Sequence, residues 1–112
     1  MSWYNTIVLS FCNSEWDSDQ LNPPQDLKPL VEINKWLVNS GFKTLTDLNE
    51  AGHLGSNAVL LGGCYNYLDV EEFCLFVQSL PWRFLEDVQI LFWGDNDSKF
   101  SVIEFPMAEE NH

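Results

Sequence analysis

The spacing of apolar residues changes between two periods along the chain, and the order of these periods constrains the fold more than any other feature. Residues 3–11 read WYNTIVLSF and alternate strictly. One side carries Ile7, Leu9 and Phe11, and the other carries Thr6, Val8 and Ser10. A period of two is typical of a β-strand, so the chain is expected to open with one.

A helical period follows at residues 29–40. Leu30, Ile33 and Leu37 fall on one stripe, and Trp36 lies one turn round from it. Pro29 suits the first turn, where a missing N–H has no helical partner. Gly41 fits the left-handed position that commonly ends a helix.

The stretch from residue 58 to residue 81 predicts a strand followed by a second helix. AVLLGGCYNY is an apolar run in which Gly62 and Gly63 indicate either a bulge or a close approach of another backbone. Asp69 and Glu72 then have the spacing of a capping box, so the helix should begin near Val70 and end before Pro81.

Two further extended runs, DVQILFWG and KFSVIEF, are joined by DNDS and predict an antiparallel hairpin. Residues 43–57 are ambiguous between a short turn of helix and a short strand. The resulting order is β-α-β-α-β-β. It predicts an α/β (α+β) two-layer sandwich, with two helices on one face of a four-stranded mixed sheet that ends in the hairpin. A ferredoxin-like split arrangement is the alternative, although it would usually end differently. Residues 1–106 should form one compact domain and residues 107–112 a polar tail.

The charge balance indicates the class of partner. There are 17 acidic residues against five Lys and Arg, which gives a formal net charge of −12. So few cations make direct nucleic-acid binding an unlikely role, and a basic protein partner is the natural complement. The other interpretation is a highly soluble domain whose charge has no target.

The compartment is expected to be the cytoplasm. Cys12, Cys64 and Cys74 are an odd number without paired spacing. The first apolar run has no basic residues before it, unlike a secretion signal, and no apolar stretch approaches the roughly 18 residues of a membrane span.

No stretch carries a strong catalytic or cofactor signature, so we expect a non-enzymatic protein with no cofactor and no metal. GGCYN lacks the residues of a P-loop, and DNDSK lacks the Gly and Glu positions of a calcium loop. The alternative is a small thiol-dependent enzyme that uses Cys64 with His53 as its base.

Aromatic and acidic side chains supply the candidate contacts with a partner. Alternation along residues 88–93 places Trp93 with Gln89 and Leu91, opposite the remaining three residues of the run. If both helices cover one sheet face, one of these sets must face outward, unless the loops at residues 12–26 and 43–57 fold over it. The expected partner-binding residues are Asp69, Glu71, Glu72, Trp82, Glu86, Asp87 and Trp93.

Small size, acidity and the lack of catalytic motifs make the chain similar in character to bacterial immunity and antitoxin-like inhibitors. The resemblance implies an acidic surface that neutralises a basic protein by fast, salt-sensitive association. The second hypothesis is a structural homodimer, formed through an aromatic sheet face or through the edge of the last strand.

Overall fold

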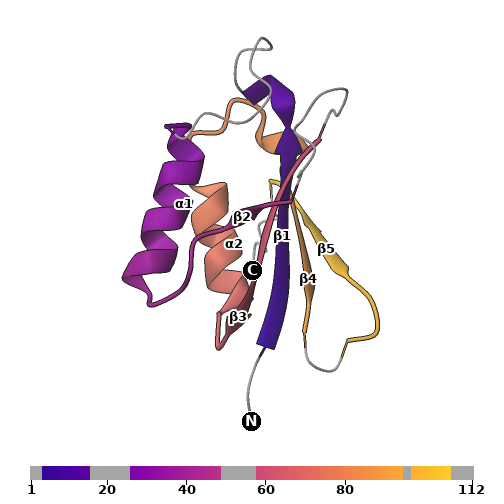
Figure 1. Ribbon diagram of the computed structural model, residues 1–112. Coiled ribbons are helices and arrows are strands. Elements are labelled where there is room, and N and C mark those ends of the chain that lie inside the picture. Colours follow the sequence, from indigo (N-terminus) through magenta and orange to yellow (C-terminus); the bar gives the residue numbers. More distant parts are fainter. Residues whose placement is uncertain (1–3, 16–25, 49–57, 95–96, 107–112) are drawn as a thin grey trace, which may run out of the picture.

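Two helices cover one face of a single five-stranded sheet in the computed structural model of the chain (Figure 1). The structure describes residues 4–15, 26–48, 58–94 and 97–106. The elements in chain order are β1 (Tyr4–Cys12), η1 (Asn13–Glu15), α1 (Lys28–Asn39), β2 (Thr46–Asp47), β3 (Ala58–Asn66), α2 (Val70–Gln78), η2 (Leu85–Asp87), β4 (Gln89–Trp93) and β5 (Ser101–Glu104).

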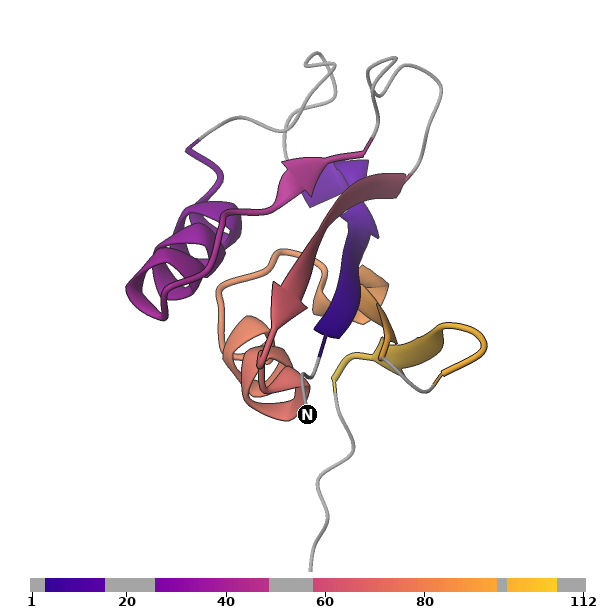
Figure 2. The ribbon, with the colours of Figure 1, turned by 60° about the horizontal axis from the view of Figure 1, so that its bottom comes forward.

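The sheet has the strand order β2-β3-β1-β4-β5, and every pair of neighbours is antiparallel. The predicted mixed sheet of four strands is therefore wrong, although the α+β class and the helices on one face are confirmed. The reason is β2, which reverses the chain once more between α1 and β3. Figure 2 shows β2 at one edge of the sheet and the β4–β5 hairpin at the opposite edge.

Each helix joins two strands that run in the same direction with one strand between them. The unit β1-α1-β2 spans β3, and the unit β3-α2-β4 spans β1. Two interleaved split units of this kind form the ferredoxin-like connectivity. β5 is added beyond β4, and this extra strand is the ending by which the chain departs from that connectivity.

Both helices form where the sequence predicts them, with α1 displaced by one residue. In α1, Leu30, Ile33 and Leu37 are buried, Pro29 lies in the first turn, and Gly41 follows the helix with a φ of +86°. In α2 the side chain of Asp69 accepts a hydrogen bond of 3.1 Å from the backbone N–H of Glu72. The predicted cap is thus present, and α2 ends at Gln78, three residues before Pro81.

The glycine pair in β3 serves a close approach and not a bulge. β3 pairs with β1 residue by residue through Gly62 and Gly63 without an extra residue. A Cβ on Gly62 would lie 2.9 Å from the carbonyl oxygen of Ile7, and one on Gly63 would lie 2.6 Å from the hydroxyl of Tyr65. A side chain at either position would overlap its neighbour.

The core lies between the sheet and the helices. Alternate residues of β1 provide its centre: Ile7, Leu9 and Phe11 are almost fully buried, and Leu9 is paired with the buried Ile90 of β4. Trp36 of α1 stacks on Phe76 of α2 with ring centroids 5.6 Å apart. This contact closes the layer between the two helices.

A buried carboxylate links the end of β1 to the segment after α2. Glu15 accepts hydrogen bonds from the backbone N–H groups of Arg83, at 2.9 Å, and Phe84, at 2.7 Å. The guanidinium of Arg83 donates in return to the carbonyl of Ser14. These contacts fix the start of η2, and hence the positions of Glu86 and Asp87, beside the end of β1.

Candidate functional site

The candidate site is the sheet face opposite the helices, which no described helix or strand covers. We call it the open face. It is formed by Thr6, Val8, Ser10, Leu60, Gly62, Cys64, Gln89, Leu91, Trp93, Val102 and Glu104, whose positions follow from the strand registers. Of the two sets that alternation along β4 separates, the one containing Trp93, Leu91 and Gln89 faces outward.

An apolar row crosses the middle of the open face. Val8 of β1 is opposite Leu91 of β4, and Leu91 is opposite Val102 of β5. Val102 exposes 53% of its surface. On the other side of Val8, the exposed Leu48 lies over Gly62 and extends the row toward β2. The row therefore presents aliphatic side chains across much of the width of the sheet.

Two aromatic rings lie beside this row, toward the end of β4. Trp93 and Phe100 meet edge to face with centroids 5.2 Å apart, and they are 37% and 38% exposed. The indole N–H of Trp93 donates to the carbonyl of Asp97 at 2.9 Å, while the Asp97 carboxylate accepts from the N–H of Gly94 at 2.7 Å. The hairpin thus holds the indole in one orientation.

Acidic residues lie on the other side of the apolar row, toward the start of β4. Glu104 is opposite Gln89, which is opposite Ser10. Beside this row is an open hollow of about 370 Å³, lined by Ser10, Phe11, Cys12, Ala58, Glu86, Asp87 and Gln89. η2 brings Glu86 and Asp87 to the hollow, so three exposed carboxylates border this end of the open face.

The seven predicted contact residues do not form one surface. Trp93, Glu86 and Asp87 border the open face, at opposite ends of it. Asp69, Glu71 and Glu72 lie at the start of α2 in the helical layer, where Asp69 caps the helix. They follow the end of β3 that pairs with Tyr4, far from the end of β1 that η2 adjoins.

Trp82 has a structural role that the sequence did not reveal. Its ring centroid is 5.2 Å from that of Phe11, and its indole N–H donates to the carbonyl of Val77 at 2.8 Å. It closes the core near the C-terminal end of α2 and is only partly exposed.

Several residues of the open face were not predicted as contacts: Val8, Leu91, Val102 and Glu104. Phe100, which packs against Trp93, was not predicted either. Alternation in the first strand already separated Val8 from the buried set, so the signal existed for that residue. For Val102 and Glu104 the decisive fact is the register of β5 against β4, which depends on the whole sheet.

Of the predicted pair of Cys64 and His53, the structure describes only the cysteine. Cys64 is exposed on the open face, with its Sγ 3.6 Å from the hydroxyl oxygen of Thr6. His53 lies outside the described residues. Cys74 is buried in α2, and burial together with the charge of Glu71 raises its pKa to about 12. Within the described ranges no group of three or more His, Cys, Asp or Glu residues is arranged to hold a metal ion.

Tyr65 carries a buried polar atom on the helix side of β3. Its hydroxyl makes no hydrogen bond to any described residue. Burial, with a smaller contribution from Cys64, raises its pKa above the usual 10. The ring packs edge-on against Phe42 at 5.6 Å between centroids, so the hydroxyl belongs to the core and not to the open face.

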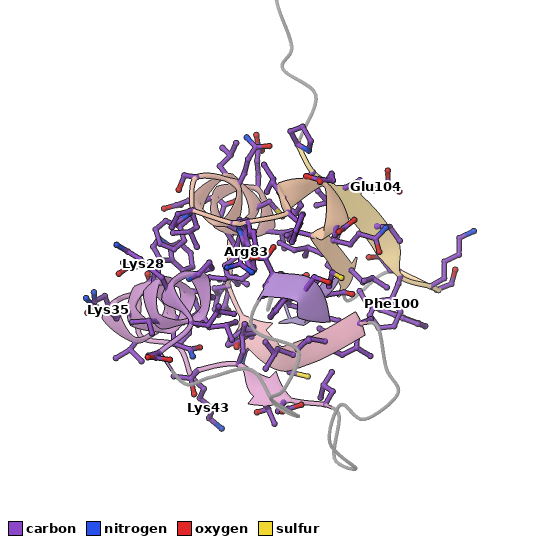
Figure 3. The ribbon with its side chains drawn as sticks, turned by 90° about the horizontal axis from the view of Figure 1, so that it is seen from above. Lys28, Lys35, Lys43, Arg83, Phe100 and Glu104 are labelled. Carbon is purple, nitrogen blue, oxygen red and sulfur yellow. The ribbon has the colours of Figure 1, made fainter. Side chains whose placement is uncertain are left out.

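Three of the cations lie away from the open face, on the side of α1. Lys28 and Lys35 belong to α1 and Lys43 follows it, and Figure 3 shows these three away from Phe100 and Glu104. Lys99, in the β4–β5 connection, is the cation nearest in sequence to the open face. Three of the five Lys and Arg residues are thus on the side of α1.

Comparison with known proteins gives no relative: the chain matches no protein-family model, no curated protein and no solved structure. Among the described residues, neither helix has the length and apolar character needed to cross a membrane.

Proposed function

We propose that this protein is a non-enzymatic, acidic protein-binding domain that neutralises or regulates a basic protein, in the manner of an immunity or antitoxin-like inhibitor. The observation that carries the proposal is the charge: 17 acidic residues against five Lys and Arg on one small domain. A negative potential of this size attracts a basic protein over distances of about a Debye length and accelerates its association.

The distribution of charge supports a protein partner. The exposed acids Glu71, Glu72, Glu86, Asp87 and Glu104 come from different elements, so the potential surrounds a folded surface and is not confined to a tail. A domain of this kind can surround apolar groups with carboxylates, as a protein interface surrounds an apolar core with a polar rim.

The proposal is tested by affinity capture from a lysate of the source organism at about 0.05 M and about 0.3 M NaCl. The wild-type protein is compared with a Glu86→Gln/Asp87→Asn double variant and a Glu71→Gln/Glu72→Gln double variant, each of which removes two charges. We expect one basic protein that is retained at the higher salt, and whose purified form binds with an association rate that falls as salt rises.

The result against the proposal is equally specific. The proposal is contradicted if the captured proteins are not basic. It is also contradicted if the purified partner binds equally well at low and high salt, because the charge would then not drive binding. Recovery of only further copies of this chain would favour the homodimer. Light scattering at several protein concentrations separates that outcome, because a dimer changes the measured mass.

A further inference from the structure

We propose that the basic partner docks on the open face, with the apolar row as the centre of the contact and Glu86, Asp87 and Glu104 pairing with the partner's cations. This inference rests on the proposed function and assigns it a surface. It excludes the acids at the start of α2 from the main contact.

The first support is a group of apolar side chains on the open face that no described residue covers. Val102, Trp93 and Phe100 are all more than a third exposed, and they adjoin the half-buried Val8 and Leu91 in one continuous area. Scattered exposed apolar residues are ordinary, but a contiguous patch with a polar border is typical of an interface. Aromatic residues at such a centre commonly carry much of the binding energy.

The second support is preorganisation. Trp93 is held by its hydrogen bond to Asp97 and by the edge-to-face contact with Phe100. An aromatic side chain already fixed in its orientation loses little conformational entropy when a partner covers it. Rows on paired strands are likewise rigid, so the face is ready for contact without rearrangement.

The distribution of charge favours a basic protein over a second copy of this chain as the molecule that binds the open face. Carboxylates at the hollow and on β5 border the apolar row, whereas Lys28, Lys35 and Lys43 lie on the side of α1. Two copies meeting open face to open face would join two molecules of net charge −12. Like charges placed opposite one another oppose association, whereas Lys or Arg residues of a partner would satisfy them.

The test uses two synthetic peptides of equal positive charge, one alternating Lys with Val and the other alternating Lys with Ser. Binding is mapped by amide chemical shifts of the labelled full chain at low salt. We expect the Lys-Val peptide to shift the amides of Val8, Leu91 and Val102 and the indole of Trp93. The Lys-Ser peptide should bind about tenfold more weakly, because it lacks the apolar contacts.

A matched pair of variants tests the location. Val102 and Val38 are similarly exposed, at 53% and 57%, but Val102 is on the open face and Val38 is on the outer side of α1. Val102→Arg should weaken binding of the Lys-Val peptide by about tenfold or more, since it adds bulk and a repelling charge at the centre. Val38→Arg, with the same change in net charge, should weaken it less than about twofold. Circular dichroism verifies that both variants are folded, and Val102→Ser replaces Val102→Arg if the latter is not.

The outcomes separate this inference from the proposed function. Shifts confined to α1 or α2, or equal losses in the two variants, overturn the docking site and leave a basic partner in place. If neither peptide binds at low salt, the proposed function fails as well. A dimer that Val102→Arg dissociates would show that the open face is occupied by a second copy, and would also overturn the inference.

Discussion

At the scale of single residues, Gly62 is required by the neighbouring backbone. A Cβ there would lie 2.9 Å from the carbonyl oxygen of Ile7, in a strand that cannot move away without losing its pairing with β4. We expect Gly62→Ala to lower the free energy of unfolding by about 1–3 kcal/mol, the usual cost of overpacking. Urea denaturation measures it.

Leu48 provides the control for this substitution, because its Cδ1 would also lie 2.9 Å from the added Cβ. If the backbone contact dominates, adding Leu48→Ala to Gly62→Ala will not restore the stability. If Gly62→Ala is as stable as the wild type, the two strands must be able to move apart enough to admit the added methyl group at little cost.

Tyr65 carries a polar atom with no visible contribution to the stability of the fold. Its hydroxyl is buried without a hydrogen-bond partner among the described residues. Tyr65→Phe should therefore leave the free energy of unfolding unchanged or raise it by up to about 1–2 kcal/mol, since the desolvation cost of an unpaired group disappears. A clear loss of stability in urea denaturation would instead reveal a partner for the hydroxyl, such as an ordered water molecule.

Cys74 gives a pH dependence. Its pKa rises from 9 in the unfolded chain to about 12 in the fold, because burial and Glu71 disfavour the thiolate. Below pH 9 both states keep the proton. Above it the unfolded chain loses the proton first, so stability falls as pH rises toward 12, by at most about 1.4 kcal/mol per unit from this group.

The measurement is the free energy of unfolding between pH 9 and pH 10, before Tyr65 adds its own dependence. Cys74→Ala serves as the control and should show a flatter profile in that interval. If the free energy of unfolding falls with pH equally steeply in the two proteins, the Cys74 thiol ionises as readily in the folded state as in the unfolded one.

At the scale of elements, Glu15 joins β1 to the segment that leads into η2. Glu15→Gln should lower the free energy of unfolding by about 1–3 kcal/mol. The carboxylate now accepts hydrogen bonds from two backbone N–H groups, and in the variant the amide NH₂, itself a donor, would face one of them. Glu104→Gln is the matched control on an exposed strand and should change stability by less than about 0.5 kcal/mol. Thermal or urea denaturation of both variants decides the matter.

The elements also show what the sequence could predict. Both helices and the hairpin carry periodic apolar residues and capping or turn signals, and they form close to the expected positions. β2 has only two residues, Thr46 and Asp47, and a strand of that length has no period to detect. The sequence left residues 43–57 open between a helical turn and a strand. Because β2 reverses the chain, leaving it out of the predicted sheet changed a purely antiparallel sheet into a mixed one.

The candidate site was predictable only in its local part. Alternation in β4 correctly grouped Trp93 with Gln89 and Leu91, since side-chain direction is set within the strand. It left open which of the two sets faces outward. The grouping of the acids depends instead on which end of the sheet each connection reaches, and this follows from topology. The packing of Trp82 on Phe11 could not be predicted, because this contact is made between distant parts of the chain.

At the scale of the whole molecule, the net charge of −12 should oppose folding by self-repulsion. Raising NaCl from about 0.01 M to about 0.1 M shortens the Debye length from about 30 Å to about 10 Å, so the urea midpoint should rise. Glu86→Gln/Asp87→Asn should start from a higher midpoint and respond less to salt. If the urea midpoint of the wild type does not change with salt, the negative charges of the carboxylates must already be offset by nearby groups.

The central position of β1 affects how the protein is made. β1 is the earliest strand described, yet its two neighbours, β3 and β4, are both later in the chain. While the ribosome is still translating, Ile7, Leu9 and Phe11 therefore leave the exit tunnel on a strand with two unpaired edges. That strand stays available to chaperones, or to neighbouring nascent chains, until residue 93 has emerged.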